Sequence, residues 1–385
     1  MERVTLSSIN QYVSATVNPA DTPEDLFELY SVPSYENQYP EIVKGKEIGS
    51  AKAVVQEGDV LICKINPKIN RVWVVKHNTE YPLLASSEWI VVRNSAINSN
   101  YLKWYFMSPF FRKLLTSQVA GIGGSLTRAQ PKQVAKYPVP IVELEKQGKI
   151  VNLLEKVNFV ISARQQQLAK LDELVKARFV EMFGDSEYNT KHWPVVKLSD
   201  ICEVGSSKRI YKNEQSSSGV PFLRISDLNE RIDGKVKNPE IFISIEKYDE
   251  LKLQGMVPIA GDVLVTSRGT LGRCYIVTEE DVFYFQDGMI SWLSKIDARA
   301  ASLYLSYLFS MRGIQKQIEM LQAGSTVAYL SITMLKKLDI MLPPPELQRR
   351  FLSFAEQIDK LKLSIKKSLE QMKTLKKALM QQYFG

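Results

Sequence analysis

The stretch Gly261-Asp-Val-Leu264 repeats Gly58-Asp-Val-Leu61, which stands 203 positions earlier in the chain. Further matches follow in the same order: Tyr101-Leu102 with Tyr304-Leu305, Gly124-Ser125 with Gly324-Ser325, Glu145 with Glu346, Gln147 with Gln348, and Phe183-Gly184 with Phe384-Gly385. Self-similarity at a nearly constant spacing is the signature of a repeated structural unit. The chain of 385 residues is therefore predicted to contain two copies of one unit.

The first part of each unit is predicted to be a globular domain of mixed strands and helices. Runs that alternate in hydrophobicity predict strands at Val60–Ile65, Arg71–Val75, Val263–Thr266 and Cys274–Val277. Both Gly-Asp pairs stand directly before a strand and suit turns. Buried helices are predicted over Tyr101–Leu115, with an end or kink at Pro109, and over Leu303–Gln315, and short helices at Pro131 and after Ser331.

The end of each unit changes to a helical pattern after a proline segment. Apolar residues recur there at steps of three and four, the pattern of helices that pack along a shared seam. The predicted seam consists of Ile150, Leu153, Val157, Val160, Leu168, Leu171 and Leu174 in the first copy, and of Phe351, Phe354, Ile358, Leu361, Ile365, Leu369, Met372, Leu375 and Leu379 in the second. Related seams can bury each other, which favours a helix pair over a single amphipathic helix packed on its own domain.

The formal net charge of +8 is concentrated in the two helical segments. Residues 1–145 carry a net +1 and residues 185–345 a net −1, whereas residues 146–184 carry +3 and residues 346–385 carry +5. A basic balance favours a polyanionic partner. Two uses of the helical charge stay open: contact with phosphates, or docking of acidic faces on partner proteins. We favour docking, because neutral domains alone should bind a polyanion weakly.

Missing motifs argue against several classes of function. The three cysteines stand far apart and only two histidines are present, so no metal-ligand spacing exists and neither a metal nor a cofactor is expected. Neither a dinucleotide-binding glycine motif nor a phosphate-binding loop occurs. No run reaches the ~18 apolar residues of a membrane span, so a soluble, cytoplasmic protein is expected. The sequence favours binding over catalysis.

A polar hairpin tip follows each Gly-Asp strand, and these tips are the main binding candidates. Arg suits a guanine edge, Asn suits an adenine edge, and Lys, Arg and Thr bind phosphates. The candidate residues are Lys64, Asn66, Lys68, Asn70 and Arg71 in the first tip, and Arg268, Thr270 and Arg273 in the second. On composition alone, an exposed and merely soluble hairpin is an equal alternative.

Weaker candidates lie outside the tips. A Gly-Ser loop precedes the short helix of each copy and could hold a phosphate, although a helix stop explains its glycine equally well. The polar residues of this loop are Ser125 and Arg128 in the first copy and Ser325 and Thr326 in the second. The second copy also has a basic loop with Lys208 and Arg209, and a segment with Arg224 and Asp227 that an internal ion pair explains as well.

Taken together, these features resemble the DNA specificity (S) subunits of Type I restriction-modification systems. The residues that carry the resemblance are Gly261–Gly272, Gly324-Ser325, Leu342-Pro-Pro-Pro-Glu-Leu-Gln348 and the two terminal helices. The resemblance extends over essentially the whole chain. The first copy departs from the pattern, because Lys64–Arg71 stands where the tip should read Ser-Arg-Gly-Thr.

The resemblance implies an α+β fold with an internal pseudo-two-fold duplication. Residues 1–145 and 185–345 would be target recognition domains, and residues 146–184 and 346–385 would be spacer helices in an antiparallel coiled coil. Each domain would read one half of an asymmetric, gapped site in double-stranded DNA. Two modification subunits that methylate adenine N6 would be partners, with restriction subunits as optional further partners and no membrane. The chain itself would be non-catalytic.

Two other interpretations stay open on the sequence alone. One is a free-standing DNA methyltransferase or restriction enzyme, which would transfer a methyl group or cut DNA without added subunits. The other is a coiled-coil scaffold that binds no DNA. A loss of DNA affinity on changing Arg268 and Arg71, with folding intact, would count against the scaffold.

Overall fold

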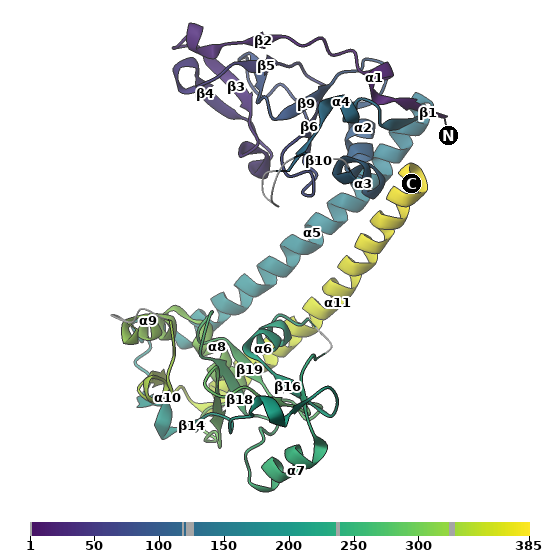
Figure 1. The fold of residues 1–385 in the computed structure, drawn as a ribbon. Coiled ribbons are helices and arrows are strands. Elements are labelled where there is room, and N and C mark those ends of the chain that lie inside the picture. Colours follow the sequence, from purple (N-terminus) through teal and green to yellow (C-terminus); the bar gives the residue numbers. More distant parts are fainter. Residues whose placement is uncertain (1, 118, 121–126, 236–238, 323–327) are drawn as a thin grey trace. The chain divides into compact units, whose positions relative to one another are not determined.

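The chain divides into two compact units in the computed structural model (Figure 1). Unit 1 consists of residues 1–166 and 365–385, and unit 2 of residues 167–364. Each unit contains one globular domain and parts of two long helices, α5 (Leu144–Phe183) and α11 (Pro345–Phe384). The structure describes residues 2–117, 119–120, 127–235, 239–322 and 328–385. In these ranges, no helix combines the length and apolar character needed to cross a membrane.

The domain of unit 1 is built on a five-stranded and a three-stranded sheet, of order β2-β5-β8-β3-β4 and β7-β6-β9. Its strands are β1 (Glu2–Thr5), β2 (Thr16–Val17), β3 (Leu26–Tyr30), β4 (Glu41–Lys44), β5 (Lys52–Val54), β6 (Val60–Cys63), β7 (Val72–Val74), β8 (Leu83–Ala85), β9 (Trp89–Val92), β10 (Val119–Ala120), β11 (Arg128–Ala129) and β12 (Pro138–Ile141). Its helices before α5 are α1 (Leu6–Ile9), α2 (Ser99–Phe106), α3 (Pro109–Ser117) and α4 (Pro131–Val134).

The domain of unit 2 is built on two four-stranded sheets, of order β14-β21-β18-β19 and β15-β17-β16-β20. Its strands are β13 (Val195–Lys197), β14 (Glu203–Gly205), β15 (Gln215–Ser216), β16 (Val220–Leu223), β17 (Phe242–Ile243), β18 (Val263–Thr266), β19 (Cys274–Ile276), β20 (Tyr284–Phe285), β21 (Ile290–Ser294) and β22 (Asp339–Met341). Its helices are α6 (Ile225–Ile232), α7 (Ile245–Leu253), α8 (Ser302–Ser310), α9 (Arg312–Leu321) and α10 (Ile332–Lys336).

Both units contain the same framework, which confirms the predicted duplication. A central antiparallel strand lies between two others, β6 between β7 and β9 in unit 1 and β18 between β19 and β21 in unit 2. The other sheet has a parallel pair, β3 with β8 or β16 with β20. Gly58 and Gly261 have φ of +88° and +93° directly before the central strands. Glycine favours this left-handed conformation, so the predicted turns are confirmed.

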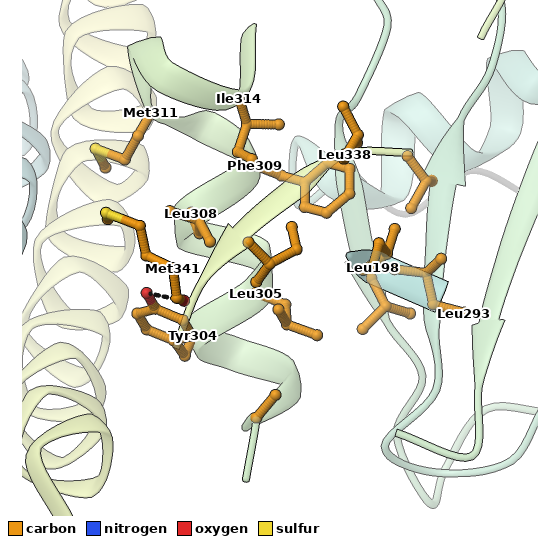
Figure 2. Packing of buried hydrophobic residues seen from close by; sticks show 14 of the residues in the cluster. Leu198, Leu293, Tyr304, Leu305, Leu308, Phe309, Met311, Ile314, Leu338 and Met341 are labelled. Atoms are coloured by element: carbon orange, nitrogen blue, oxygen red, sulfur yellow. Dashed lines mark hydrogen bonds between the residues drawn. The ribbon is translucent and has the colours of Figure 1, made fainter. Parts of the chain in front are cut away.

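The second domain packs around α8, as Figure 2 shows. Tyr304, Leu305, Leu308 and Phe309 of this helix belong to a buried cluster with Leu198, Leu293, Leu338 and Met341. The Tyr304 hydroxyl donates to the Met341 carbonyl at 2.9 Å. Tyr101 makes the corresponding bond in unit 1, to the Pro140 carbonyl at 3.0 Å. The duplication therefore extends to single hydrogen bonds of buried side chains.

A buried glutamine near the start of each long helix joins the helix to its domain. Gln348 is 1% exposed, and its side-chain Oε1 accepts from the Ala301 N–H at 2.9 Å. Its Nε2 donates to the carbonyls of Arg299 and Pro343, at 2.7 and 2.8 Å. Gln147 repeats the arrangement, accepting from the Asn98 N–H and donating to the Val142 carbonyl, both at 2.8 Å. These bonds fix the direction in which each helix leaves its domain.

The two long helices run antiparallel within each unit, as predicted. In unit 1, Trp104 contacts Glu155 of α5 and Lys376 of α11. In unit 2, Lys362 of α11 pairs with Asp172 of α5 at 2.6 Å. The resemblance to an antiparallel coiled coil is confirmed in this respect.

Each long helix ends on the domain that it did not start from. The Phe384 ring at the end of α11 lies 5.5 Å from Tyr101 and 5.8 Å from Tyr105, between ring centroids. The Phe183 ring at the end of α5 lies 5.0 Å from Tyr304 and 5.4 Å from Phe351. Both phenylalanines are buried. Each domain core is therefore completed by an aromatic residue from the far end of a long helix.

The predicted helix seam is only partly right. Its buried members include Ile150, Val157, Phe351, Ile358, Leu369 and Leu379. Four predicted members are exposed instead, namely Leu153, Leu174, Leu361 and Leu375. Leu154 and Val175, next to two of these positions, are buried, and so are Ala355 and Met380 elsewhere on α11. The reason is that a domain also covers each helix end, so the buried face is wider than a coiled-coil seam and follows the period of a straight helix.

The apolar stretches of the two copies also differ from the prediction in one place. The break at Pro109 is confirmed, since α2 ends at Phe106 and α3 begins at Pro109. The prediction of one helix over Leu303–Gln315 is wrong. Met311 has an extended backbone and separates α8 from α9. This break allows Gly313 to approach the backbone of Ser186, where a Cβ atom would lie 2.2 Å from the carbonyl oxygen.

We predict that Gln348→Leu destabilises unit 2 by about 1–3 kcal/mol, because it leaves a buried N–H and two carbonyls without their partner. Urea unfolding of the full chain measures this loss. The control is Glu346→Gln on the exposed side of the same helix turn, for which a change below about 0.5 kcal/mol is expected. Equal midpoints for the two variants would show that the amide does not hold the helix to the domain.

Candidate nucleic-acid interface

The second tip is a hairpin between β18 and β19 with a fixed base and an exposed end. The Thr266 side chain closes it, since Oγ1 donates to the Thr270 carbonyl at 2.5 Å and accepts from the Arg273 N–H at 3.0 Å. The exposed residues are Arg268, Gly269 and Thr270. The hairpin thus presents Arg268 and Thr270 to solvent, as the sequence analysis expected for a binding element.

Arg268 is held by an aromatic ring. Its guanidinium lies over Tyr329, 5.0 Å from the ring centroid, and the two residues form an isolated antiparallel bridge. Stacking of this kind holds a guanidinium in place and leaves its N–H groups for other acceptors. Arg268 is therefore suited to bind a guanine edge or a phosphate.

Arg273, the third candidate of the second tip, is used inside the domain. Its guanidinium donates to Asn229 Oδ1 at 2.8 Å and pairs with Asp233 Oδ1 at 2.5 Å. The same guanidinium lowers the pKa of the Asp233 carboxyl. Arg273 therefore connects the tip to α6 and its following turn, and it positions the tip.

The first tip lies between β6 and β7 and has a smaller exposed end. Lys68 and Ile69 are exposed, whereas Lys64, Asn66 and Asn70 are half-buried. Asn66 and Asn70 have φ of +47° and +53°, so they shape the turn in conformations that Asn tolerates better than most residues. Lys68 is the most accessible of the charged candidates in this tip.

The remaining polar candidates of the first tip are bound within the domain. The Asn70 side-chain amide donates to the Phe106 carbonyl at 2.9 Å. Arg71 pairs with Glu36 at 3.3 Å, and the Arg71 side chain is 15% exposed. These two side chains hold the hairpin to its surroundings.

The backbone around the two tips is hydrogen-bonded in the same way. In unit 1 the Ala129 N–H donates to the Lys64 carbonyl, and in unit 2 the Leu330 N–H donates to the Ser267 carbonyl. An isolated bridge joins Ile65 to Arg128, where the second copy joins Arg268 to Tyr329. The two equivalent bridges thus carry their arginine on different segments. Arg268 belongs to the tip itself, whereas Arg128 belongs to the segment that pairs with the tip. The copies share a framework and differ in the side chains that it presents.

The basic loop of unit 2 lies next to the second tip. The Lys208 N–H donates to the Tyr284 hydroxyl at 2.8 Å, and Arg209 pairs with Asp287 at 2.9 Å. Both partners belong to β20 or the turn after it. This turn also accepts the Ser267 N–H through the Met289 carbonyl. Lys208 and Arg209 are exposed and join the tip in one candidate surface.

The other candidates differ in what the structure shows of them. Ser125, Ser325 and Thr326 lie outside the described residues. Arg224 caps the start of α6 and pairs with Asp227 and Glu240, which is the internal ion pair that the sequence left as an alternative. Arg128 is exposed and pairs with Glu88 at 2.9 Å.

The three cysteines and the possible metal ligands were the remaining candidates for chemistry in the described residues. Burial raises the pKa of the thiols of Cys63, Cys202 and Cys274, which disfavours the reactive thiolate. Across the described ranges, no group of three or more His, Cys, Asp or Glu side chains could hold a metal ion.

Sequence reasoning missed the partners that decide the roles of the arginines. Tyr329, Asn229 and Asp233 lie more than thirty positions from the arginines that they contact. One signal was present for Tyr329: the spacing of 201 that relates the later matches also relates it to Arg128. For Asn229 and Asp233, only the packing of α6 against the hairpin brings their side chains to Arg273.

Residues 190–373 match the family model of the Type I restriction modification DNA specificity domain. The chain is 29% identical over 287 residues to an inferred type I restriction enzyme specificity subunit of Haemophilus influenzae, covering 73% of this chain and 69% of that protein. Residues 190–373 therefore carry a Type I DNA specificity domain, and the chain as a whole is similar to specificity subunits of Type I restriction-modification systems. The resemblance stated from the sequence is thereby confirmed, and recognition of a DNA sequence follows as the general function that this domain indicates.

Two solved structures share the fold of this chain. One is a chain of a structure described as the basis of complex assembly and conformational transition of the type I R-M system; it aligns with a TM-score of 0.61 at 19% identity, over 100% of this chain and 97% of that chain. The other is the S subunit of a Type I system from M. genitalium, with a TM-score of 0.55 at 12% identity, over 100% and 96%. The α+β fold class is confirmed.

Two glycines of the second tip offer a matched test of its rigidity. We predict that Gly272→Ala destabilises the domain by about 2–3 kcal/mol, because φ is +72° and a Cβ would lie 2.8 Å from Ile318 Cδ1. Gly269→Ala shares the conformation, with φ of +71°, but its Cβ would meet nothing within 4 Å, so about 1 kcal/mol is expected. Urea unfolding compares them. Equal losses would mean that the base of the tip is not tightly packed.

Proposed function

We propose that the chain reads an asymmetric, gapped site in double-stranded DNA through two target recognition domains, residues 1–145 and 185–345. The observation that carries this proposal is the repeated backbone framework with unlike side chains at its tips. Two readers of different half-sites need this combination, because a shared framework gives a shared docking geometry and different side chains give different base contacts.

Within each domain we assign the DNA contacts to the exposed candidates. In the second domain these are Arg268, Thr270, Lys208 and Arg209, and in the first they are Lys68 and Arg128, with Lys64 and Asn66 at the side of the tip. Arg273, Asn70 and Arg71 position the tips. Ser125, Ser325 and Thr326, which lie outside the described residues, stay in the proposal on their sequence alone.

We further propose that α5 and α11 are the surface on which two adenine-N6 methyltransferase subunits assemble, with restriction subunits as optional partners. Methyl transfer and ATP-dependent cleavage belong to those partners, and this chain takes no catalytic step. Large apolar side chains stand out on the helices, with Phe159 73% and Leu363 70% exposed. Exposed apolar groups beside lysines suit a protein interface better than a phosphate contact. A complex of this kind would act on DNA in the cytoplasm.

The structure shows which lysines of α11 are exposed and which one makes contacts inside unit 1. Lys366, Lys367, Lys373 and Lys377 are exposed. Lys376 is used internally: its ammonium group lies 4.9 Å from the Trp104 ring centroid and donates to Asn158 at 2.7 Å. Burial lowers the pKa of this lysine. Lys376 therefore belongs to the contact of the helices with the first domain. Lys373 pairs with Glu370 on its own helix, and Lys366, Lys367 and Lys377 remain for partners.

Selection of bound sequences from random duplex DNA tests the recognition proposal. The wild-type chain, assembled with its methyltransferase partner, should return two unlike half-sites separated by unspecified bases. Arg268→Ala should relax one half-site only, with a loss of about 1–3 kcal/mol of discrimination at the base it contacts. A continuous or perfectly palindromic site, or relaxation of both halves together, would contradict the proposal.

Neutralising the helical lysines tests the assembly proposal. We expect Lys366→Gln, Lys367→Gln and Lys377→Gln, combined, to weaken binding of the methyltransferase subunits, because exposed charge steers and orients association. The assembled complex should keep its DNA affinity and salt dependence. The control combines Lys113→Gln, Lys252→Gln and Lys336→Gln, three exposed lysines outside the long helices. Weakened DNA binding with normal assembly would instead assign the helical charge to phosphates.

A further inference from the structure

The same turn of both domains carries a carboxylate. In unit 1 it connects β8 to β9 and contains Glu88; in unit 2 it connects β20 to β21 and contains Asp287. The turns are equivalent in their backbone contacts. Each begins with an N–H that donates to the end of the parallel neighbour, from Ser86 to the Tyr30 carbonyl and from Gln286 to the Leu223 carbonyl. Each turn therefore holds its carboxylate at the base of a recognition tip.

Both turns are also bonded directly to the tips. The Lys64 N–H donates to the Glu88 carbonyl, and the Ser267 N–H donates to the Met289 carbonyl, each at 2.9 Å. A carboxylate on this turn lies beside the surface that the proposed function assigns to DNA.

Each carboxylate binds an arginine of that surface. Glu88 Oε1 lies 2.9 Å from Arg128, and Asp287 Oδ2 lies 2.9 Å from Arg209. The glutamate and aspartate side chains are 24% and 22% exposed, and the arginine side chains are 57% and 65% exposed. In both pairs the acid is fixed in the domain and the guanidinium is accessible. The two arginines come from different segments, so the pairing is repeated although its cation is not.

These pairs differ from the buried ion pair of the first domain. The Asp59 side chain is 0% exposed and accepts two bonds from Arg93, at 2.8 and 2.7 Å. That pair is bidentate and buried on one side, so separating it would leave a charge without a partner. The pairs of Glu88 and Asp287 have one bond each and an exposed cation, so their contribution to stability is small. A phosphate can displace them.

We propose that Glu88 and Asp287 are specificity-determining residues that compete with DNA phosphates for Arg128 and Arg209. DNA of any sequence offers phosphates. To bind one, each arginine must exchange its carboxylate for the phosphate, so the net gain in binding free energy is small. The preferred site adds base contacts from the tips, which supply the remaining affinity. This inference rests on the proposed function, and it explains how exposed arginines coexist with domains of net charge +1 and −1.

Binding of the full chain to a random-sequence duplex pool at several salt concentrations tests this competition. Glu88→Gln and Asp287→Asn should each raise affinity for the pool about three- to tenfold. The salt dependence should steepen by about one power of salt concentration for each freed arginine. The preference for the selected site over the pool should fall. Adding Arg128→Gln to the Glu88→Gln variant should remove the gain.

The control is Asp297→Asn, which changes the net charge equally and frees Arg299. Asp297 follows the last residue of β21, Ser294. The first residue of that strand, Ile290, is the one that pairs with Thr266 beside the tip. The control should change affinity for the pool less than twofold. An equal gain in this control would assign the effect to net charge and overturn the inference.

Two further outcomes separate the inference from the proposed function. Variants that keep the wild-type preference and bind the pool no more tightly would overturn the inference alone. A loss of affinity for the selected site without a gain for the pool would also overturn it, because the carboxylates would then merely orient the arginines. A wild-type chain that selects no sequence would overturn the proposed function and, with it, the inference. Urea unfolding midpoints confirm that each variant is folded.

Discussion

The buried side-chain amide of Gln348, with that of Gln147 in the first copy, is the contact on which the arrangement of each unit depends. The Gln348 amide binds backbone groups just before α8 and α11, and the Gln147 amide binds those just before α2 and α5. Each amide thereby fixes the first turn of a long helix to a domain. A neutral amide suits this place, because it satisfies both a donor and acceptors without a buried charge.

The domains combine accessible cations with almost no net charge, and individual contacts show how. Arg273 is paired inside the second domain, Arg268 is stacked on an aromatic ring, and Arg209 is paired at the surface. Three arginines close together in one domain thus have three different environments. Their number alone, or the net charge of the segment, says little about the surface that a polyanion meets.

Sequence predicted the duplication, the central strands and the exposed end of the second tip, because these depend on local patterns. The turns at Gly58 and Gly261 are examples, since a left-handed φ is a local requirement. The role of Arg273 was out of reach, because its partners come from α6. The seam was displaced for a similar reason: a heptad pattern describes one helix on another, whereas Val175 also packs in the core of the second domain. The assignment of individual residues to DNA stays a prediction.

The placement of Phe384 in the core of the first domain has a consequence for biosynthesis. Unit 2 is one continuous segment, residues 167–364, whereas unit 1 needs residues 365–385 in addition to 1–166. Domains fold as they leave the ribosome, from the N-terminus onwards. Here the order of completion is reversed: the second unit can close while the first still lacks the aromatic residue that packs on Tyr101 and Tyr105. Completion of the first unit therefore waits for residues 365–385, and a product truncated before them would leave that unit unfinished.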